Sequence, residues 1–231
     1  MPENFDSVCL FSAGLDSSVA LASFRADGHR ILAVTVDYGQ RARAAEARQA
    51  RRLCERWQVP HRQVDLPFFA ALSGGALLDP KAPLPRPDRR MLDAAGPDLQ
   101  ETARRVWVPN RNGVLINVAA AIAESLGARF VVTGFNREEA ATFKDNSAEF
   151  VEAVNASLRY STRNSVEVVS PTLHLSKSEI ALLGRALGVP FDLLWPCYES
   201  GDRWCEECES CGRFRRAMEA CGWTDPPGSR G

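Results

Sequence analysis

The stretch that decides the fold is residues 8–18, Val-Cys-Leu-Phe-Ser-Ala-Gly-Leu-Asp-Ser-Ser. Val8 to Phe11 form an apolar run that predicts a buried strand, and an amphipathic helix is expected from Val19 toward Gly28. The small residues between them let backbone N–H groups turn inward around an anion, and the helix N-terminus adds about half a positive charge. Ligands of open α/β sheets bind beyond the carboxyl ends of the strands, so we expect a phosphate site at this turn. The alternative is a simple helix N-cap made by Ser or Asp.

The turn matches neither of two common nucleotide-binding patterns. It lacks the lysine of G-x-x-x-x-G-K-[ST], and it lacks G-x-G-x-x-G, which disfavours a Walker loop and a dinucleotide fold. It resembles the S-G-G-x-D-S motif of the PP-loop ATP pyrophosphatases, with Ala13 in place of the second glycine. Alanine there adds a methyl group and is penalised if φ is positive. That superfamily often supplies a late basic residue, and Lys177 lies where it is expected; the alternative for Lys177 is a solvated lysine in a first helical turn.

Beyond this turn, strands alternate with helices of about 10 to 15 residues, which predicts a doubly wound parallel sheet with helices on both faces. Further strands are expected at 31–36, 61–66, 129–133 and 166–170, and helices at 42–57, 113–126, 147–160 and 176–187. Residues 67–106 lose periodicity and carry many prolines, which predicts an insertion or lid. The expected organisation is a nucleotide-binding α/β domain over 1–190, a metal-binding segment over 191–223 and a flexible tail over 224–231.

Composition narrows the class of protein. The chain has 231 residues, of which 45% are hydrophobic, enough for one well-buried core. Its net charge of −1 gives no bulk attraction to nucleic acid or membrane surfaces. No apolar run approaches the roughly 20 residues of a membrane span. The first residues carry no basic segment ahead of their apolar run, so we expect a cytoplasmic protein without a secretory signal.

Four cysteines lie within 15 residues near the end of the chain, at Cys197, Cys205, Cys208 and Cys211. Four thiolates at this spacing predict a tetrahedral zinc site, and an iron–sulfur cluster is the alternative. Four protein ligands leave no open position, so the metal is expected to be structural. The acidic residues between these cysteines, Glu206, Glu207 and Glu209, are expected to form a solvated face.

Across nearly its whole length the chain resembles the 7-cyano-7-deazaguanine synthase (QueC) family. The matching segments are FSAGLDSS at 11–18, VDYGQRAR at 36–43, VPNRN at 108–112, TGFNREEAATFKDNS at 133–147, SPTLHLSKSEI at 170–180 and the cysteine segment after Trp195-Pro196. The chain departs from the family at Ala13, at Lys144 where proline is common, and at Glu206 where glycine is frequent. These departures affect local geometry more than the resemblance.

The resemblance implies a single overall reaction, in which 7-carboxy-7-deazaguanine, ammonia and two ATP give a nitrile. A carboxylate oxygen leaves poorly, so transfer of AMP to it makes AMP the leaving group, and ammonia then forms an amide. A second adenylation, on the amide oxygen, permits dehydration to the nitrile. The protein chiefly has to hold pyrophosphate, align the acceptor and offset developing charge. Mg²⁺ is expected to accompany ATP.

The resemblance also implies roles for individual residues. The implied catalytic residues are Ser17, Lys177, which would neutralise pyrophosphate, and Arg111, which would hold a carboxylate or phosphate and whose alternative is a surface ion pair. The implied nucleotide-binding residues are Phe11, Ser12, Ala13, Gly14, Leu15, Asp16, Ser17, Ser18, Asp37 and Gly134. The implied substrate-binding residues are Tyr38, Gln40, Arg41, Asn112, Asp145 and Asn146, the last two toward a purine-like ring unless they only cap a loop.

Three other interpretations remain open at this point. A PP-loop enzyme that thiolates tRNA would need a catalytic cysteine pair or an added RNA-binding domain, and the basic residues here are not clustered. A zinc-stabilised nucleotide-binding or scaffold module would not need an intact Ser17 and Lys177. A related protein could keep these motifs and act on another acceptor. We expect small-molecule partners and no nucleic acid or membrane partner, with a homodimer as one option for the assembly.

Overall fold

The structure is a computed structural model, and it describes residues 4–72, 75–87 and 97–223. Five parallel strands form one sheet in the order β3-β2-β1-β4-β5. Their bounds are β1 Ser7–Leu10, β2 Ile31–Asp37, β3 His61–Asp65, β4 Phe130–Val132 and β5 Glu167–Val169. Each strand begins and ends within one residue of its predicted position. The predicted parallel sheet is therefore confirmed.

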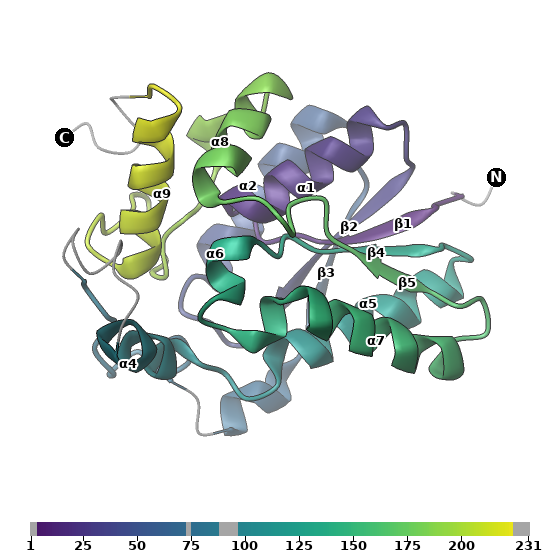
Figure 1. Cartoon of the computed structure of the whole chain (residues 1–231), viewed down its shortest axis with the longest axis horizontal. Helices are drawn as coiled ribbons and strands as arrows, with labels where there is room; N and C mark the ends of the chain where they lie inside the picture. The colour runs from purple at the N-terminus through teal and green to yellow at the C-terminus, as the bar shows by residue number, and fades with distance from the viewer. Residues whose placement is uncertain (1–3, 73–74, 88–96, 224–231) are drawn as a thin grey trace.

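Helices cover both faces of the sheet, as Figure 1 shows, with α1, α2 and α8 on one face and α5 and α7 on the other. The bounds are α1 Leu15–Ala26, α2 Arg43–Trp57, α5 Arg111–Ser125, α7 Ala148–Ser161 and α8 Lys177–Ala186. Neighbouring residues of β1 serve the two faces in turn, because Val8 packs in one buried cluster and Cys9 in the other. Two apolar layers thus sandwich the sheet.

The order of the strands in the sheet indicates where a ligand-binding crevice lies. The chain runs from β1 outward to β2 and β3, then crosses to the other side of β1 and continues with β4 and β5. The direction of winding reverses between β1 and β4, so a crevice opens beyond the carboxyl ends of these two strands. The serine-rich turn after β1 lies at this reversal.

Several short elements were not predicted from the sequence. They are the 3₁₀ turns η1 Pro67–Ala71, η2 Lys144–Asn146 and η3 Phe191–Leu193, and the helices α4 Pro97–Val106, α6 Arg137–Ala140 and α9 Glu209–Ala220. Within the predicted insertion, Phe69, Leu77 and Leu84 are buried in the same core as the sheet. The described part of the insertion is therefore packed onto the domain; its role as a lid remains a prediction.

Helix α1 begins at Leu15, four residues before the predicted start at Val19. The turn and the first helical turn overlap, which brings Asp16 and Ser17 onto the helix itself. The predicted flexible tail at 224–231 lies outside the described residues, as do 73–74 and 88–96 of the predicted insertion. Among the helices that the structure describes, none combines the length and apolar character needed to cross a membrane.

Candidate active site and cysteine cage

The turn after β1 is closed by its own serine hydroxyls. The Ser17 hydroxyl accepts a hydrogen bond from the Ser12 N–H at 3.3 Å, lies 3.2 Å from the Ser12 hydroxyl and donates to the Gly14 carbonyl at 3.3 Å. The Gly14 N–H lies 3.4 Å from the Ser12 hydroxyl. No side chain caps the first turn of α1 within the described residues, which sets aside the simple N-cap interpretation. The hydroxyls and free N–H groups are available to an anion.

Ala13 adopts a left-handed conformation with φ of 60° and is fully buried. Its carbonyl accepts the Trp195 N–H at 2.9 Å, which ties the turn to the segment before the cysteines. A positive φ explains why related motifs carry glycine here, and the alanine methyl costs roughly 1 to 2 kcal/mol of backbone strain. Gly134 is required for a different reason: a Cβ there would lie 2.6 Å from the Ser17 nitrogen. The segment just after β4 therefore lies directly against the first turn of α1.

Lys177 opens α8 and lies at one end of the pocket. Its ammonium is 2.6 Å from the carboxylates of both Asp16 and Glu139, and the residue is 7% exposed. Burial alone would lower the pKa of Lys177, but Asp16 and Glu139 raise it above its ordinary value, so the group stays charged. The alternative of a solvated lysine in a first helical turn is therefore excluded for Lys177. The Lys177 backbone N–H donates to Glu138 at 2.9 Å.

Glu138 connects this end of the pocket to the C-terminal helix. Arg216 of α9 donates to its carboxylate, and Arg213 lies 4.0 Å from it. Arg213 in turn forms an ion pair with Glu209 at 2.8 Å, and both side chains are almost fully buried. The expected solvated face is therefore wrong for Glu209, because Arg213, one helical turn later, draws its carboxylate inward. The buried charges extend from the turn to α9.

Arg111 and its neighbours form the floor of the pocket. The guanidinium donates to the Tyr38 hydroxyl and to the Asn112 side chain, each at 3.3 Å, and lies 5.8 Å from the centre of the Tyr38 ring. Asn112 in turn donates to the Asp145 carbonyl at 3.3 Å, and Asn146 donates to the Asp145 carboxylate at 3.2 Å. These contacts favour a pocket residue over a surface ion pair for Arg111, since its guanidinium lacks a carboxylate partner within the described region.

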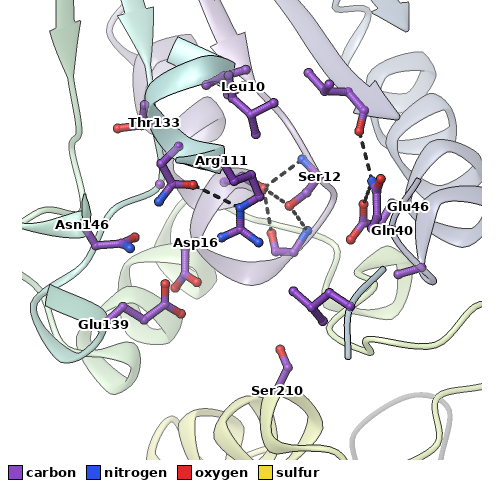
Figure 2. Close-up of a pocket in the computed structure, with 18 of the residues that line it drawn as sticks. Leu10, Ser12, Asp16, Gln40, Glu46, Arg111, Thr133, Glu139, Asn146 and Ser210 are labelled. Atoms are coloured by element: carbon purple, nitrogen blue, oxygen red, sulfur yellow. Dashed lines mark hydrogen bonds between the residues drawn. The ribbon is translucent and has the colours of Figure 1, made fainter. Parts of the chain in front are cut away.

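Glu46 and Gln40 form the opposite end of the pocket, as Figure 2 shows. The Gln40 amide donates to Glu46 at 2.8 Å and to the Val36 carbonyl at 3.0 Å, while its oxygen accepts the Tyr38 N–H at 2.9 Å. Burial raises the pKa of Glu46 to about 7, against the opposing effects of Gln40 and Arg111. Sequence reasoning missed Glu46, because it sits in an Ala- and Arg-rich run typical of a solvated helix.

Most of the residues implied by the resemblance converge on this pocket. Its lining includes Phe11, Ser12, Gly14, Leu15, Asp16, Ser17, Tyr38, Gln40, Arg111, Asn112, Gly134, Asp145, Asn146 and Lys177. Other lining residues were not predicted, and they include Thr35, Glu46, Trp107, Glu139, Phe143 and Ser210. Their sequence positions are scattered, so only the fold brings them together.

Four of the site residues that the family resemblance implies do not line the pocket. Ala13 and Ser18 are fully buried beneath the turn. Asp37 accepts the Gly39 N–H at 2.9 Å and faces Arg43 at 3.8 Å. Arg41 forms an ion pair with Glu199 and donates to the Ala82 carbonyl at 2.9 Å, which ties the insertion to the cysteine segment. The structure thus gives Arg41 a scaffolding position, and its substrate contact remains a prediction.

The four cysteines meet as predicted. Their sulfur atoms all lie within 4.8 Å of one another. Zinc–sulfur bonds of about 2.3 Å give a tetrahedron with edges of about 3.8 Å, so the group has the dimensions of a metal cage. Backbone N–H groups of Glu199 and Cys205 point at the Cys197 sulfur, each at 3.3 Å, and stabilise a thiolate. Glu206, which replaces a frequent glycine, has φ of 61°.

A parallel sheet with a serine-rich phosphate turn at its winding reversal defines a nucleotide-binding protein of the PP-loop class. Residues 6–222 match the family model described as "Queuosine biosynthesis protein QueC", and the chain belongs to this family. It is 49% identical over 216 residues to the 7-cyano-7-deazaguanine synthase of Pelotomaculum thermopropionicum, covering 94% of this chain and 97% of that one. It is 47% identical to the enzyme of that name from Bdellovibrio bacteriovorus, covering 94% of each.

Solved structures with a related shape are more distant. The NMN synthetase of Francisella tularensis aligns with a TM-score of 0.48 at 15% identity, covering 94% of this chain and 85% of that one.

Proposed function

We propose that this protein converts 7-carboxy-7-deazaguanine and ammonia into 7-cyano-7-deazaguanine, with two ATP cleaved to AMP and pyrophosphate. The proposal rests above all on one observation: the phosphate turn, Lys177 and Arg111 line a single pocket at the carboxyl edge of the sheet. Near-identical chain lengths and 49% identity to a relative of that name support the choice of reaction. Cleavage between the α- and β-phosphates suits a turn that lacks the Walker lysine.

The turn and Lys177 would hold the pyrophosphate that leaves in each half of the reaction. Ser12 and Ser17 provide hydroxyl donors, and the start of α1 contributes its partial positive charge. In the described structure Asp16 and Glu139 fix the position of the Lys177 ammonium, and the two carboxylates outweigh its single positive charge. The ammonium is therefore preorganised for a phosphate oxygen, and a cation bound beside the carboxylates would offset their charge.

The floor of the pocket would hold the acceptor. Arg111 has two contacts to neutral groups and keeps its full charge for a carboxylate or phosphate. Asp145 and Asn146 fit a purine-like ring, because a carboxylate accepts from ring amino and N–H groups. Orientation of the acceptor next to the α-phosphate would supply much of the rate.

A magnesium ion fits beside the phosphate turn. The second carboxylate oxygen of Asp16 is buried and has no hydrogen-bond partner among the described residues, and Glu139 lies across Lys177 from it. Carboxylate oxygens together with substrate phosphates are the ligands that Mg²⁺ prefers. Asp16 and Glu139 would hold the ion, which would neutralise phosphate charge when bound.

The metal of the cysteine cage is proposed to be zinc. Four thiolates in a closed set, with N–H donors behind them, fit a structural zinc ion better than a catalytic one. The cysteine segment and α9 are then held as one unit against Glu138. The chain is further proposed to act in the cytoplasm on small molecules, with the domain limits given above.

The test is the product formed by the purified protein. Incubation with ATP, ammonium and 7-carboxy-7-deazaguanine should give the nitrile together with AMP and pyrophosphate. Release of ADP and orthophosphate as primary products would exclude the proposed adenylation. Filter binding with tRNA separates the proposal from a tRNA-thiolating enzyme, which would retain tRNA on the filter.

A further inference from the structure

We propose that Glu46 accepts the protons that the reacting nitrogen loses, an inference that rests on the nitrile-forming reaction proposed above. The nitrogen enters as ammonia with three hydrogens and ends in a nitrile with none. Attack of ammonia on the acyl adenylate forms the C–N bond, breaks the C–O bond to AMP with its electron pair, and releases one proton. Adenylation of the amide oxygen releases a second proton, and loss of AMP to form the nitrile releases the third.

The other carboxylates that line the pocket already have partners. Asp16 and Glu139 share the ammonium of Lys177 at 2.6 Å each. Asp145 accepts from Asn146 at 3.2 Å, and its strongest charged neighbour is Arg111. Burial raises the pKa of Asp16 and of Asp145 while Lys177 and Arg111 oppose the rise, and Lys177 lowers the pKa of Glu139 against its burial. Protonation of Asp16 or Glu139 would break an ion pair with Lys177 that holds both carboxylates in place. These three groups suit binding more than proton transfer.

Glu46 differs because its partner is a neutral amide. One of its oxygens accepts from Gln40 at 2.8 Å, and within the described part of the chain neither oxygen is ion-paired. Gln40 is 3% exposed, and both hydrogens of its amide are used, one by Glu46 and one by the Val36 carbonyl. The Tyr38 N–H fixes the amide oxygen on the other side. Gln40 therefore holds Glu46 in one orientation and leaves its second oxygen for the pocket.

The surroundings of Glu46 bring its pKa into the range that suits a proton acceptor near neutral pH. Burial raises its pKa to about 7; the Gln40 hydrogen bond and Arg111 act against this shift, and Asp37 adds to it. Among the described residues, the charged groups that act on it are Arg111 from α5 and Asp37 from the end of β2, and the Tyr38 hydroxyl is a titratable neighbour. A proton acceptor works best when its pKa lies near the working pH.

The experiment compares two half-reactions in Glu46→Gln, whose amide is of the same size as the carboxyl group. Exchange of pyrophosphate into ATP, driven by the carboxylic acid without ammonia, involves no nitrogen. Conversion of the corresponding primary amide to the nitrile with ATP requires proton loss from nitrogen in every step. We expect exchange within about twofold of wild type and amide conversion lowered at least about a hundredfold.

The pH profile gives a second readout. In the wild type, amide conversion should rise with pH through a midpoint near 7 as Glu46 ionises, and Glu46→Gln should lose this midpoint. Glu55→Gln, an exposed glutamate on the same helix, is the matched control and should behave as wild type. Glu46→Asp should recover part of the rate, because it keeps a carboxylate, and it serves as the test variant if the glutamine variant does not fold.

Three results of these experiments would overturn the proposed role of Glu46 or the proposed function. An equal loss of exchange and amide conversion would overturn the proposal and assign Glu46 to nucleotide binding. Unchanged amide conversion in Glu46→Gln would also overturn it. If wild-type protein makes no nitrile from the acid, the proposed function itself fails, and this result is seen before any variant is measured.

Discussion

The two ends of the pocket differ in their electrostatics: one contains ion pairs, and the other contains a carboxyl group that is hydrogen-bonded to a neutral amide. At one end Lys177, Asp16 and Glu139 form a partly buried ion cluster that continues through Glu138 to the arginines of α9. At the other end the hydrogen bond that Glu46 accepts comes from the buried amide of Gln40, and its carboxylate forms no ion pair among the described residues. The ion cluster has fixed charges and, with a cation bound at its carboxylates, would suit an anion that must be held. The carboxyl group at the other end can change its charge near neutral pH and suits a proton that must be moved.

The largest expected effect comes from breaking the ion cluster. Lys177→Met leaves the partly buried Asp16 and Glu139 without their cation, and because both carboxylates keep some solvent contact we expect the loss of unfolding free energy to stay below the roughly 3 to 5 kcal/mol of a fully buried pair. Nitrile formation should fall by about a thousandfold or more. Urea denaturation and turnover measure the two effects. Lys81→Met, an exposed lysine in a turn, should change neither.

We expect the cysteine cage to stabilise the fold next to the ion cluster and to take no part in the reaction. Cys208→Ser should lower zinc content, melting temperature and solubility, with activity lost only in proportion to folded protein, because the cage leaves no open metal position. Metal analysis and thermal melting check this. Cys54→Ala, in the core and away from the cage, is the control and should keep its zinc. Iron with acid-labile sulfide, or full zinc with normal melting in Cys208→Ser, would show that the cage is misassigned.

A smaller effect is expected within the phosphate turn. Ser17→Ala removes a hydroxyl that closes the turn and faces the pocket, so turnover should fall about tenfold or more, from a loss of about 1.5 to 3 kcal/mol in a charge-assisted hydrogen bond. Folding should be nearly unchanged. Steady-state kinetics checks the rate, with Ser23→Ala on the same helix as control. A rate equal to wild type would reduce Ser17 to a structural residue of the turn.

The smallest effect is a pH dependence of stability at the Glu46 end. Because the folded-state pKa of Glu46 is raised from 4.5 to about 7, its protonated form favours the folded state. That contribution is complete below about pH 4.5 and is lost as the pH rises through 7. Melting temperature should therefore fall more between pH 5 and 8, taken as roughly the range that covers the titration, in wild type than in Glu46→Gln. Parallel curves would show that Glu46 is not perturbed.

The sequence predicts the first of these two ends better than the second. Ser12 to Ser17 are contiguous, and Lys177 follows a recognisable motif, so local pattern is enough to find them. Glu46, at the second end, joins the pocket only because distant segments of the chain meet at one edge of the sheet, and the same holds for Glu139 at the first end. Neither residue carries a local signal of its role.

Two further features, helix α9 and the left-handed residues, had signals in the sequence. Phe214, Ala217, Met218 and Cys221 are buried at helical spacing, which indicates α9 even though cysteines begin the segment. Ala13 and Glu206, which stand where related motifs carry glycine, both have φ near 60°. The glycine pattern thus predicts left-handed backbone at these sites, and the substitutions keep the conformation at a cost in strain.

The central claim is that one pocket both holds pyrophosphate and removes the protons of nitrogen. Mass spectrometry of the products from purified protein, ATP, ammonium and 7-carboxy-7-deazaguanine tests it most directly, with AMP and pyrophosphate measured in the same samples. We expect the nitrile, with two AMP and two pyrophosphate formed for each nitrile. A reaction that stops at the amide with one AMP, or that yields ADP and orthophosphate, would contradict the account.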